Sequence, residues 1–227
     1  MNRAAWQGRL AWGAVLGLLV LAFYAIRLTG PSNLEADAQD RNVGYVMDVV
    51  WQGHWLVQQD IRGRIMSKPP LHTWIAAAAA SIGGINRLTL TLPSALAVLA
   101  MSLLVLEIGR RRYGPWAGGL AALTVVLAPM MSKHIALVRT DALFALVVAL
   151  GAFAAQRAWE RGGGWAQFWF WAALATLIKG PLGLVLAAMG LLAWFWERRI
   201  DPATPPLSGS HWVGLGLFLL LVLGWLL

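Results

Sequence analysis

The chain has 227 residues, of which 59% are hydrophobic and 12% are charged, and its formal net charge is +8. Soluble domains carry about 25% charged residues, so this composition excludes an ordinary soluble domain and indicates a membrane protein. The absence of cysteine excludes a disulfide framework, thiolate catalysis and a cysteine-based metal site. The positive charge does not indicate nucleic-acid binding, because the arginines stand beside apolar runs, where they set topology and contact lipid headgroups.

Apolar runs of helix length predict the membrane spans. A spanning helix needs about 20 apolar residues, and these runs lack the alternation of barrel strands. The sequence therefore predicts an all-α, polytopic transmembrane bundle. We expect spans at residues 10–26, 88–108, 115–131, 142–158, 165–178, 182–196 and 212–227. The first run has no small-residue cleavage site after it, so we expect it to be retained as a span.

The first loop, residues 29–87, is long, and long loops are usually functional or disordered. Four of its apolar residues recur at helical spacing: Val43, Met47, Val50 and Trp51. With Asp48 and Gln52 on the other side, they predict an amphipathic interfacial helix. That helix can cap the bundle or form the wall of a site open to lipid. Residues 71–82 are apolar but too short to cross alone, so they form a re-entrant or interfacial helix or pair with the next run.

Clusters of arginine near the helix ends predict the orientation. They are Arg3 and Arg9, Arg110 to Arg112, Arg157 and Arg161, and Arg198 and Arg199. All of them lie in the cytoplasm if residues 71–82 do not cross, which is the arrangement that the positive-inside rule favours. The N-terminus is then cytoplasmic, and the outer face receives the loop 29–87 and the segments 132–141 and 179–181.

Every lysine of the chain falls on this outer face, against the topological bias: Lys68, Lys133 and Lys179. Lys68 precedes two prolines, which fix an extended backbone and then start a helix. Lys179 precedes Gly180-Pro181, a helix break of the kind tolerated at membrane depth where it lines a cavity. The lysines therefore predict an anion site, although Lys68 can also be a snorkelling side chain bound to lipid headgroups.

Acidic residues accompany the lysines on the outer face. Glu35, Asp37 and Asp40 follow the first span and can also form an ordinary solvated loop. Asp141 begins a later span beside Arg139. A carboxylate in an apolar segment is usually paired or functional, and the alternative is a favourable charge at a helix N-terminus.

Five short motifs, in this order along the chain, resemble those of the GT-C membrane glycosyltransferases of the protein-mannosyltransferase and lipid A aminoarabinose-transferase type. They are Glu35-Ala36-Asp37, Gly53-His54-Trp55-Leu56, Ser67-Lys68-Pro69-Pro70-Leu71, Arg139-Thr140-Asp141 and Lys179-Gly180-Pro181. The resemblance implies a GT-C-like fold for residues 1–227, as the N-terminal part of a transmembrane domain whose C-terminal remainder is absent. It also implies an enzyme that moves a sugar from a polyprenyl-phosphate donor, undecaprenyl phosphate in bacteria, to a lipid, glycan or protein acceptor.

The chemistry of such a transfer assigns roles to residue types. A carboxylate takes the proton of the acceptor hydroxyl, and cations stabilise the charge that develops on the leaving phosphate. The catalytic candidates are Asp37 as first choice of base, Asp40 as second choice, and Asp141. The candidates for binding the lipid phosphate are Lys68, Lys179, Arg64 and Arg139, with Arg62 and Lys133 as further helpers.

The sequence departs from the family pattern at two places, of which the first leaves the base open between Asp37 and Asp40 and the second weakens a metal ligand. Relatives often carry a paired Asp-Glu at the first acidic motif, where this chain has Glu-Ala-Asp-Ala-Gln-Asp, and an acidic residue before the K-P lysine, where it has Ser67. His72 and His134 could be metal ligands, but lone histidines near a membrane interface more often make ordinary polar contacts. A divalent metal is therefore left open, and no other cofactor is expected.

The expected partners are the lipid-linked sugar donor, membrane lipids and an unidentified acceptor, with no nucleic acid. The expected place is the bacterial inner membrane, with the active site on the outer face. Two alternatives stay open beside the enzyme. One is a transporter or flippase of a phosphate-bearing lipid, for which we see no convincing internal repeat. The other is an inactive, truncated remnant.

Overall fold

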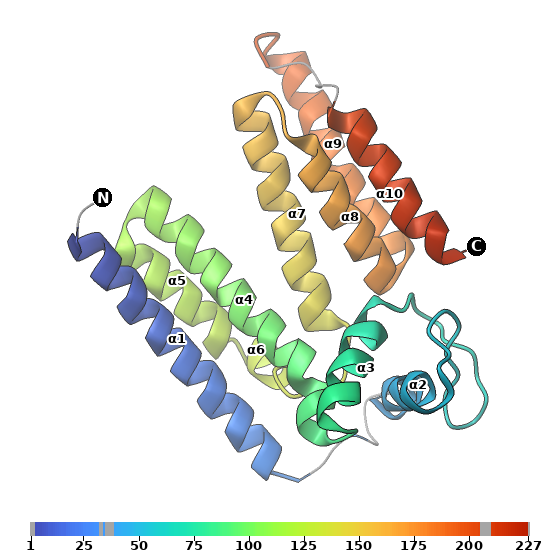
Figure 1. Cartoon of the computed structure of the whole chain (residues 1–227). Helices are drawn as coiled ribbons and strands as arrows, with labels where there is room; N and C mark the ends of the chain where they lie inside the picture. Colours follow the sequence, from blue (N-terminus) through green and yellow to red (C-terminus); the bar gives the residue numbers. More distant parts are fainter. Residues whose placement is uncertain (1–2, 32–33, 35–38, 205–209, 227) are drawn as a thin grey trace. The chain divides into compact units, whose positions relative to one another are not determined.

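Helices make up nearly all the regular structure in the computed structural model, which describes residues 3–31, 34, 39–204 and 210–226 (Figure 1). Their bounds are α1 Arg3–Thr29, α2 Gln39–Gln52, α3 Leu71–Gly83, α4 Arg87–Tyr113, α5 Pro115–Leu127, α6 Pro129–His134, α7 Asp141–Arg161, α8 Trp165–Lys179, α9 Pro181–Ile200 and α10 Ser210–Leu226. Within these residues β pairing is limited to one isolated bridge, between Gln59 and Ile65. The all-α prediction is confirmed.

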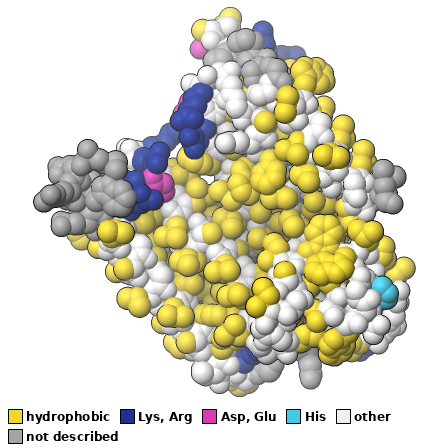
Figure 2. All heavy atoms as spheres, in the orientation of Figure 1, with side chains coloured by type: hydrophobic (Ala, Val, Ile, Leu, Met, Phe, Trp, Pro, Cys, Tyr) yellow, Lys and Arg dark blue, Asp and Glu magenta, His cyan; other side chains and the backbone are white. Residues whose placement is uncertain are grey.

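Three of the described helices are long and apolar enough to cross a membrane: Gly8–Thr29, Arg87–Tyr113 and Asp141–Arg161. They coincide with the predicted spans at 10–26, 88–108 and 142–158. Hydrophobic side chains dominate the face of the molecule shown in Figure 2, as expected of helices that contact lipid.

The predicted span at 115–131 is wrong as a single helix. α5 ends at Leu127 and α6 begins at Pro129, with Ala128 in an extended conformation between them (φ −57°, ψ 127°). Proline has no N–H and its ring disfavours helical backbone at the preceding residue, so Pro129 interrupts the run. The short α6 then leads into the non-helical segment before α7.

The chain divides into two compact units, which are described separately. The first consists of Met1–Ile65 and His72–Leu146, and the second of Met66–Leu71 and Val147–Leu227. In the first unit α1, α4 and α5 pack around buried Leu16, Val98 and Ala122. In the second, α8 packs against α9 and α10, with Trp165 and Phe168 in the core.

The amphipathic helix predicted in the first loop is confirmed as α2, but its buried face is rotated from the predicted one. Val46 and Val49 are buried against Ala76 and Ala80 of α3. Trp51 was expected on the apolar face, yet its side chain is 63% exposed. The residues that α3 covers, rather than hydrophobicity alone, select the buried face.

Candidate functional site

In the second unit the two lysine motifs pack against each other. A methyl group built on Gly180 would lie 3.8 Å from Cγ and 3.9 Å from Cδ of Pro69, which is van der Waals distance. Lys68 precedes Pro69, and Lys179 precedes Gly180. The contact therefore places two cationic residues next to one spot, with Lys68 exposed and Lys179 half-buried.

The break that positions Lys179 is built by the residues that follow it. Gly180 has φ +61°, a conformation that costs glycine little, and its N–H donates to the carbonyl of Thr176 at 2.7 Å. Pro181 then begins α9, where its missing N–H is harmless. Lys179 stands in the last turn of α8, and a cation is favoured at a helix C-terminus. The predicted helix break is confirmed.

In the first unit Arg139 and Asp141 form an ion pair, with Arg139 Nε 3.0 Å from Asp141 Oδ2. Both side chains remain partly exposed, at 33% and 27%. Asp141 is the first residue of α7, where a carboxylate is favoured by the exposed N–H groups of the helix. The ion pair is compatible with both interpretations of Asp141, as a favourable charge at a helix N-terminus and as a candidate site residue.

The start of α2 is fastened to the segment that carries this ion pair. The Val138 N–H donates to Gln39 Oε1 at 2.8 Å, and Asn42 Nδ2 donates to the Val138 carbonyl at 2.6 Å. Gln39 is fully buried, so this amide is desolvated and paired. Asp40 lies between these two α2 residues, at the helix end that contacts the segment. The role of Asp40 as a base stays a prediction.

Arg64 has a structural partner. Its Nε lies 2.7 Å from Asp60 Oδ2, and the carboxylate of Asp60 also accepts the backbone N–H groups of Arg62 and Arg64, each at 2.9 Å. Burial raises the pKa of Asp60, but these hydrogen bonds outweigh it, so the pKa lies below its usual value. Arg64 therefore closes the turn at 59–65, and its role in phosphate binding stays a prediction.

The Gly53-His54-Trp55-Leu56 motif ties the loop to α2 and α3. Gly53 ends α2 with φ +74°. The carboxylate of Asp48 in α2 pairs with His54 Nδ1 at 3.0 Å and accepts the Gln59 N–H at 2.9 Å, and the Trp55 carbonyl accepts Trp74 Nε1 from α3. These contacts give the motif a scaffolding role that sequence spacing alone did not reveal.

The first-choice base, Asp37, and its neighbour Glu35 lie outside the described residues, so the assignment of Asp37 stays a prediction. Among the described residues no group of three or more histidine, aspartate or glutamate side chains is arranged to hold a metal ion. Binding of a divalent metal ion therefore stays an open expectation from the sequence. His72 and His134 are both buried, at 2% and 8% exposed.

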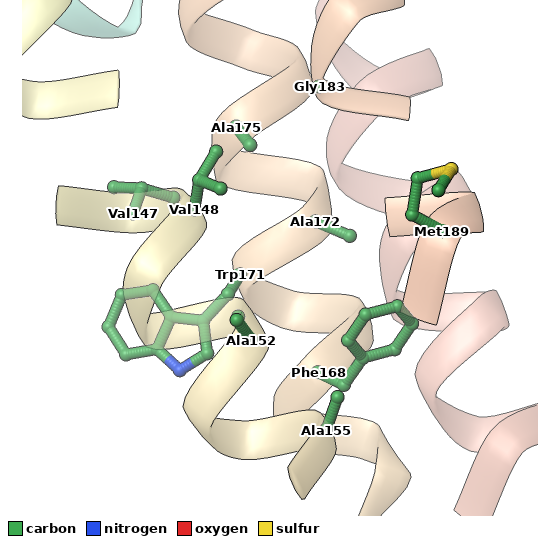
Figure 3. Close-up of a pocket in the computed structure, with 11 residues that line it drawn as sticks. Val147, Val148, Ala152, Ala155, Phe168, Trp171, Ala172, Ala175, Gly183 and Met189 are labelled. Carbon is green, nitrogen blue, oxygen red and sulfur yellow. The ribbon is translucent and has the colours of Figure 1, made fainter. Parts of the chain in front are cut away.

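An apolar pocket of about 360 Å³ lies among α7, α8 and α9 in the second unit. Figure 3 shows the rings of Phe168 and Trp171 and the side chain of Met189 around it, with small residues between them. One end of the pocket is lined by Ala175 and Gly183, which stand on either side of the Lys179-Gly180-Pro181 break.

Residues 67–226 match the model of a family described as dolichyl-phosphate-mannose-protein mannosyltransferase. The search of curated proteins found no match. Two crystal structures of ArnT from Cupriavidus metallidurans share the fold. The structure bound to undecaprenyl phosphate has a TM-score of 0.76 at 21% identity, and the apo structure has 0.73 at 20%. Each comparison covers 95% of this chain and 41% of ArnT, so the chain spans less than half the length of that protein.

Proposed function

The chain belongs to the dolichyl-phosphate-mannose-protein mannosyltransferase family, and from this premise we propose that it serves a glycosyltransferase whose sugar donor is linked to a polyprenyl phosphate. The acceptor is a lipid, glycan or protein on the outer face of the membrane. The ArnT structure similar to this chain holds undecaprenyl phosphate, which supports a carrier of the same chemical class.

The observation that carries the proposal is the contact between Pro69 and Gly180. It joins two lysine motifs from segments far apart in sequence at the end of a broken helix. We infer that the lysines next to this contact, Lys68 and Lys179, bind the phosphate group of the donor and offset its charge.

The reaction proposed is a substitution at the anomeric carbon. The acceptor hydroxyl oxygen forms the new bond to that carbon while the bond to the phosphate oxygen breaks, and polyprenyl phosphate leaves. Lys68 and Lys179 stabilise the negative charge that grows on the leaving phosphate, with Arg139 as a further cation. A carboxylate takes the hydroxyl proton, and Asp37 is our first choice, followed by Asp40 and Asp141.

The test is sugar transfer in membranes from cells that express the gene at its full length. We expect Lys68→Ala and Lys179→Ala each to lower the transfer rate by about 100- to 1000-fold, the usual cost of removing one group that stabilises developing charge. Arg161→Ala is the matched control, because it removes an exposed cation from the far end of α7. Transfer from a labelled polyprenyl-phosphate sugar gives the readout.

Near-normal transfer by both variants would show that Lys68 and Lys179 do not bind the phosphate group of the donor. A lipid that changes leaflet while its sugar stays attached would instead favour the transporter or flippase alternative. Asp37→Asn, Asp40→Asn and Asp141→Asn, measured in the same membranes, decide among the three candidate bases.

A further inference from the structure

We propose that a groove between α1 and α4 in the first unit binds an anionic phospholipid of the bilayer. The phosphate lies beside three arginines, and the start of an acyl chain lies in the groove. In the orientation that the arginine clusters predict, this lipid belongs to the cytoplasmic leaflet. The site uses none of the residues of the lysine motifs, so it does not depend on the proposed transfer reaction.

The groove has a volume of about 540 Å³, with charged side chains at one end and apolar ones along the rest. Gly13 and Ala14 line it from α1, and Leu103 and Leu106 line it from α4. Ligand pockets in proteins have volumes of about 300–1,000 Å³. The groove therefore has room for part of a lipid.

The packing of Trp12 explains why α1 leaves this space open. The Trp12 ring packs edge to face on Trp116 of α5, with the ring centroids 5.6 Å apart, and a methyl group on Gly119 of α5 would overlap it. The large side chain of this helical turn is thus used against α5, and the next two residues, which line the groove, are small. A methyl group built on Gly13 meets nothing within 4 Å, so no side chain of the described residues fills the groove there.

Three arginines surround one carboxylate at the charged end of the groove. Arg110 donates through Nε and Nη2 to the two oxygens of Glu107, each at 2.7 Å, and Arg111 donates through its Nε. Arg9 Nε lies 3.7 Å from Glu107 Oε2. Glu107 is the one acidic residue in the sequences of α1, α4 and α5, so three positive charges face one negative charge. A phosphate group offsets this surplus and accepts hydrogen bonds from guanidinium groups.

A structural network of ion pairs is the alternative explanation for these charges. Arg110 and Arg111 are favoured at the C-terminal end of α4 without any ligand. The network does not account for the groove, which continues from the charged end along apolar side chains. A phospholipid fits both parts, whereas inorganic phosphate would leave the apolar part exposed. A zwitterionic headgroup would bring a further positive charge to a site that already has a surplus of them.

Photolabelling tests the site in the protein expressed at its full length and reconstituted in phosphatidylcholine bilayers. The two probes are a phosphatidylglycerol and a phosphatidylcholine that carry the same photoreactive group near the start of one acyl chain. We expect the phosphatidylglycerol probe to label the groove-lining peptides of α1 and α4 at a concentration at least about fivefold lower, which is the effect of one arginine on an anionic lipid. Millimolar inorganic phosphate should not displace it.

Two variants separate the charge of the site from its shape. Arg9→Gln should raise the concentration of phosphatidylglycerol probe needed for half-maximal labelling about fivefold and leave the other probe unaffected. Its control is Arg27→Gln, which removes an exposed arginine at the opposite end of α1. Gly13→Leu should weaken labelling by both probes about tenfold, because it occupies space that the acyl chain would fill. Its control is Gly17→Leu, one turn further along α1, where an added methyl group also meets nothing within 4 Å.

Four results would overturn the proposal. Equal labelling by the two probes, or a preference that survives in Arg9→Gln, would show that the site does not select an anionic lipid. Displacement by inorganic phosphate would indicate a site for a free anion. Unchanged labelling in Gly13→Leu would place the acyl chain outside the groove. Absence of label from these peptides in the unaltered protein would show that another part of the full-length chain covers the groove.

Discussion

At the scale of single residues, the side chain of Arg87 caps the C-terminus of α1, where the first loop begins. Its guanidinium donates to the carbonyls of Arg27, Leu28, Gly30 and Pro31, at 2.6 to 3.2 Å. The last carbonyls of a helix have no partner within the helix, and a basic side chain can satisfy them. Arg87 begins α4 yet completes the end of α1, so it fixes where the loop leaves the membrane span.

We expect Arg87→Ala to lower the free energy of unfolding by about 2 kcal/mol, since hydrogen bonds from charged groups contribute about 1.5–3 kcal/mol before exposure is taken into account. In detergent this corresponds to a fall in Tm of about 4–8 °C. Arg41→Ala, which removes an exposed arginine of α2, is the control and should leave Tm within about 1 °C. Equal Tm values for both variants would contradict the capping role.

Asp60 gives the loop a dependence on pH. Its folded pKa lies below the ordinary value of 3.8, because the hydrogen bonds from Arg62 and Arg64 outweigh burial. The carboxylate therefore stabilises the turn fully above the ordinary pKa, and this contribution is lost as the pH falls through the lower, folded pKa. The turn should be closed at neutral pH and open under strong acid.

Hydrogen exchange at the backbone amides of Arg62 and Arg64 measures this opening once the intrinsic pH effect is removed. Asp60→Asn should reduce protection of both amides several-fold at pH 7 and abolish the additional loss below the ordinary pKa of 3.8. Asp201→Asn, at the end of α9, is the control and should not alter these amides. A pH-dependent loss that persists in Asp60→Asn would assign the effect to another group.

At the scale of helices, α4 and α5 meet at a glycine. A methyl group on Gly118 would overlap the backbone nitrogen of Arg110 and lie 2.7 Å from the Leu106 carbonyl oxygen. Small residues allow membrane helices to approach this closely, and close approach increases dispersion contacts. The α4–α5 pair depends on the absence of a side chain here.

Gly118→Ala should therefore force the two helices apart and cost about 1–3 kcal/mol, as overpacking usually does. The matched variant is Gly17→Ala in α1, where an added methyl group meets nothing within 4 Å. Because alanine favours helix more than glycine does, this control should be neutral or stabilising by up to about 1 kcal/mol. Thermal unfolding of the Gly118→Ala and Gly17→Ala variants in the same detergent tests this prediction. An equal loss of stability in the two variants would contradict the close packing of α4 and α5 at Gly118.

At the scale of the whole molecule, the orientation in the membrane is a prediction that the chain makes easy to test. It has no cysteine, so a single introduced cysteine reports its own location. Ile61 in the first loop is 74% exposed, and Tyr113 beside the arginine cluster is 77% exposed. Both side chains can be replaced without disturbing a core.

We expect Ile61→Cys to react with a membrane-impermeant maleimide in intact cells and Tyr113→Cys to react only after the membrane is permeabilised. The reason is the positive-inside rule applied to Arg110, Arg111 and Arg112. Each variant serves as the control for the other. The reverse pattern would place the lysines in the cytoplasm and remove the basis for a site on the outer face.

The sequence by itself determined the helical class, the spans that coincide with α1, α4 and α7, and the helix break at Gly180. These follow from hydropathy, helix length and the backbone limits of glycine and proline, which act locally. The same backbone limits explain the interruption at Pro129. The prediction missed it because residues 115–131 are apolar throughout most of their length. The family motifs were also readable, because their order along the chain does not depend on the fold.

Only the tertiary structure decided which of these residues meet. The contact of Pro69 with Gly180, the clamp of Gln39 and Asn42 on Val138, and the Arg87 cap on α1 all join segments far apart in sequence. No local pattern encodes such a contact, because it depends on how helices cross. Packing therefore brings together the motifs of Lys68 and Lys179, two lysines that the sequence assigned to one face, and α3 sets the face that α2 buries.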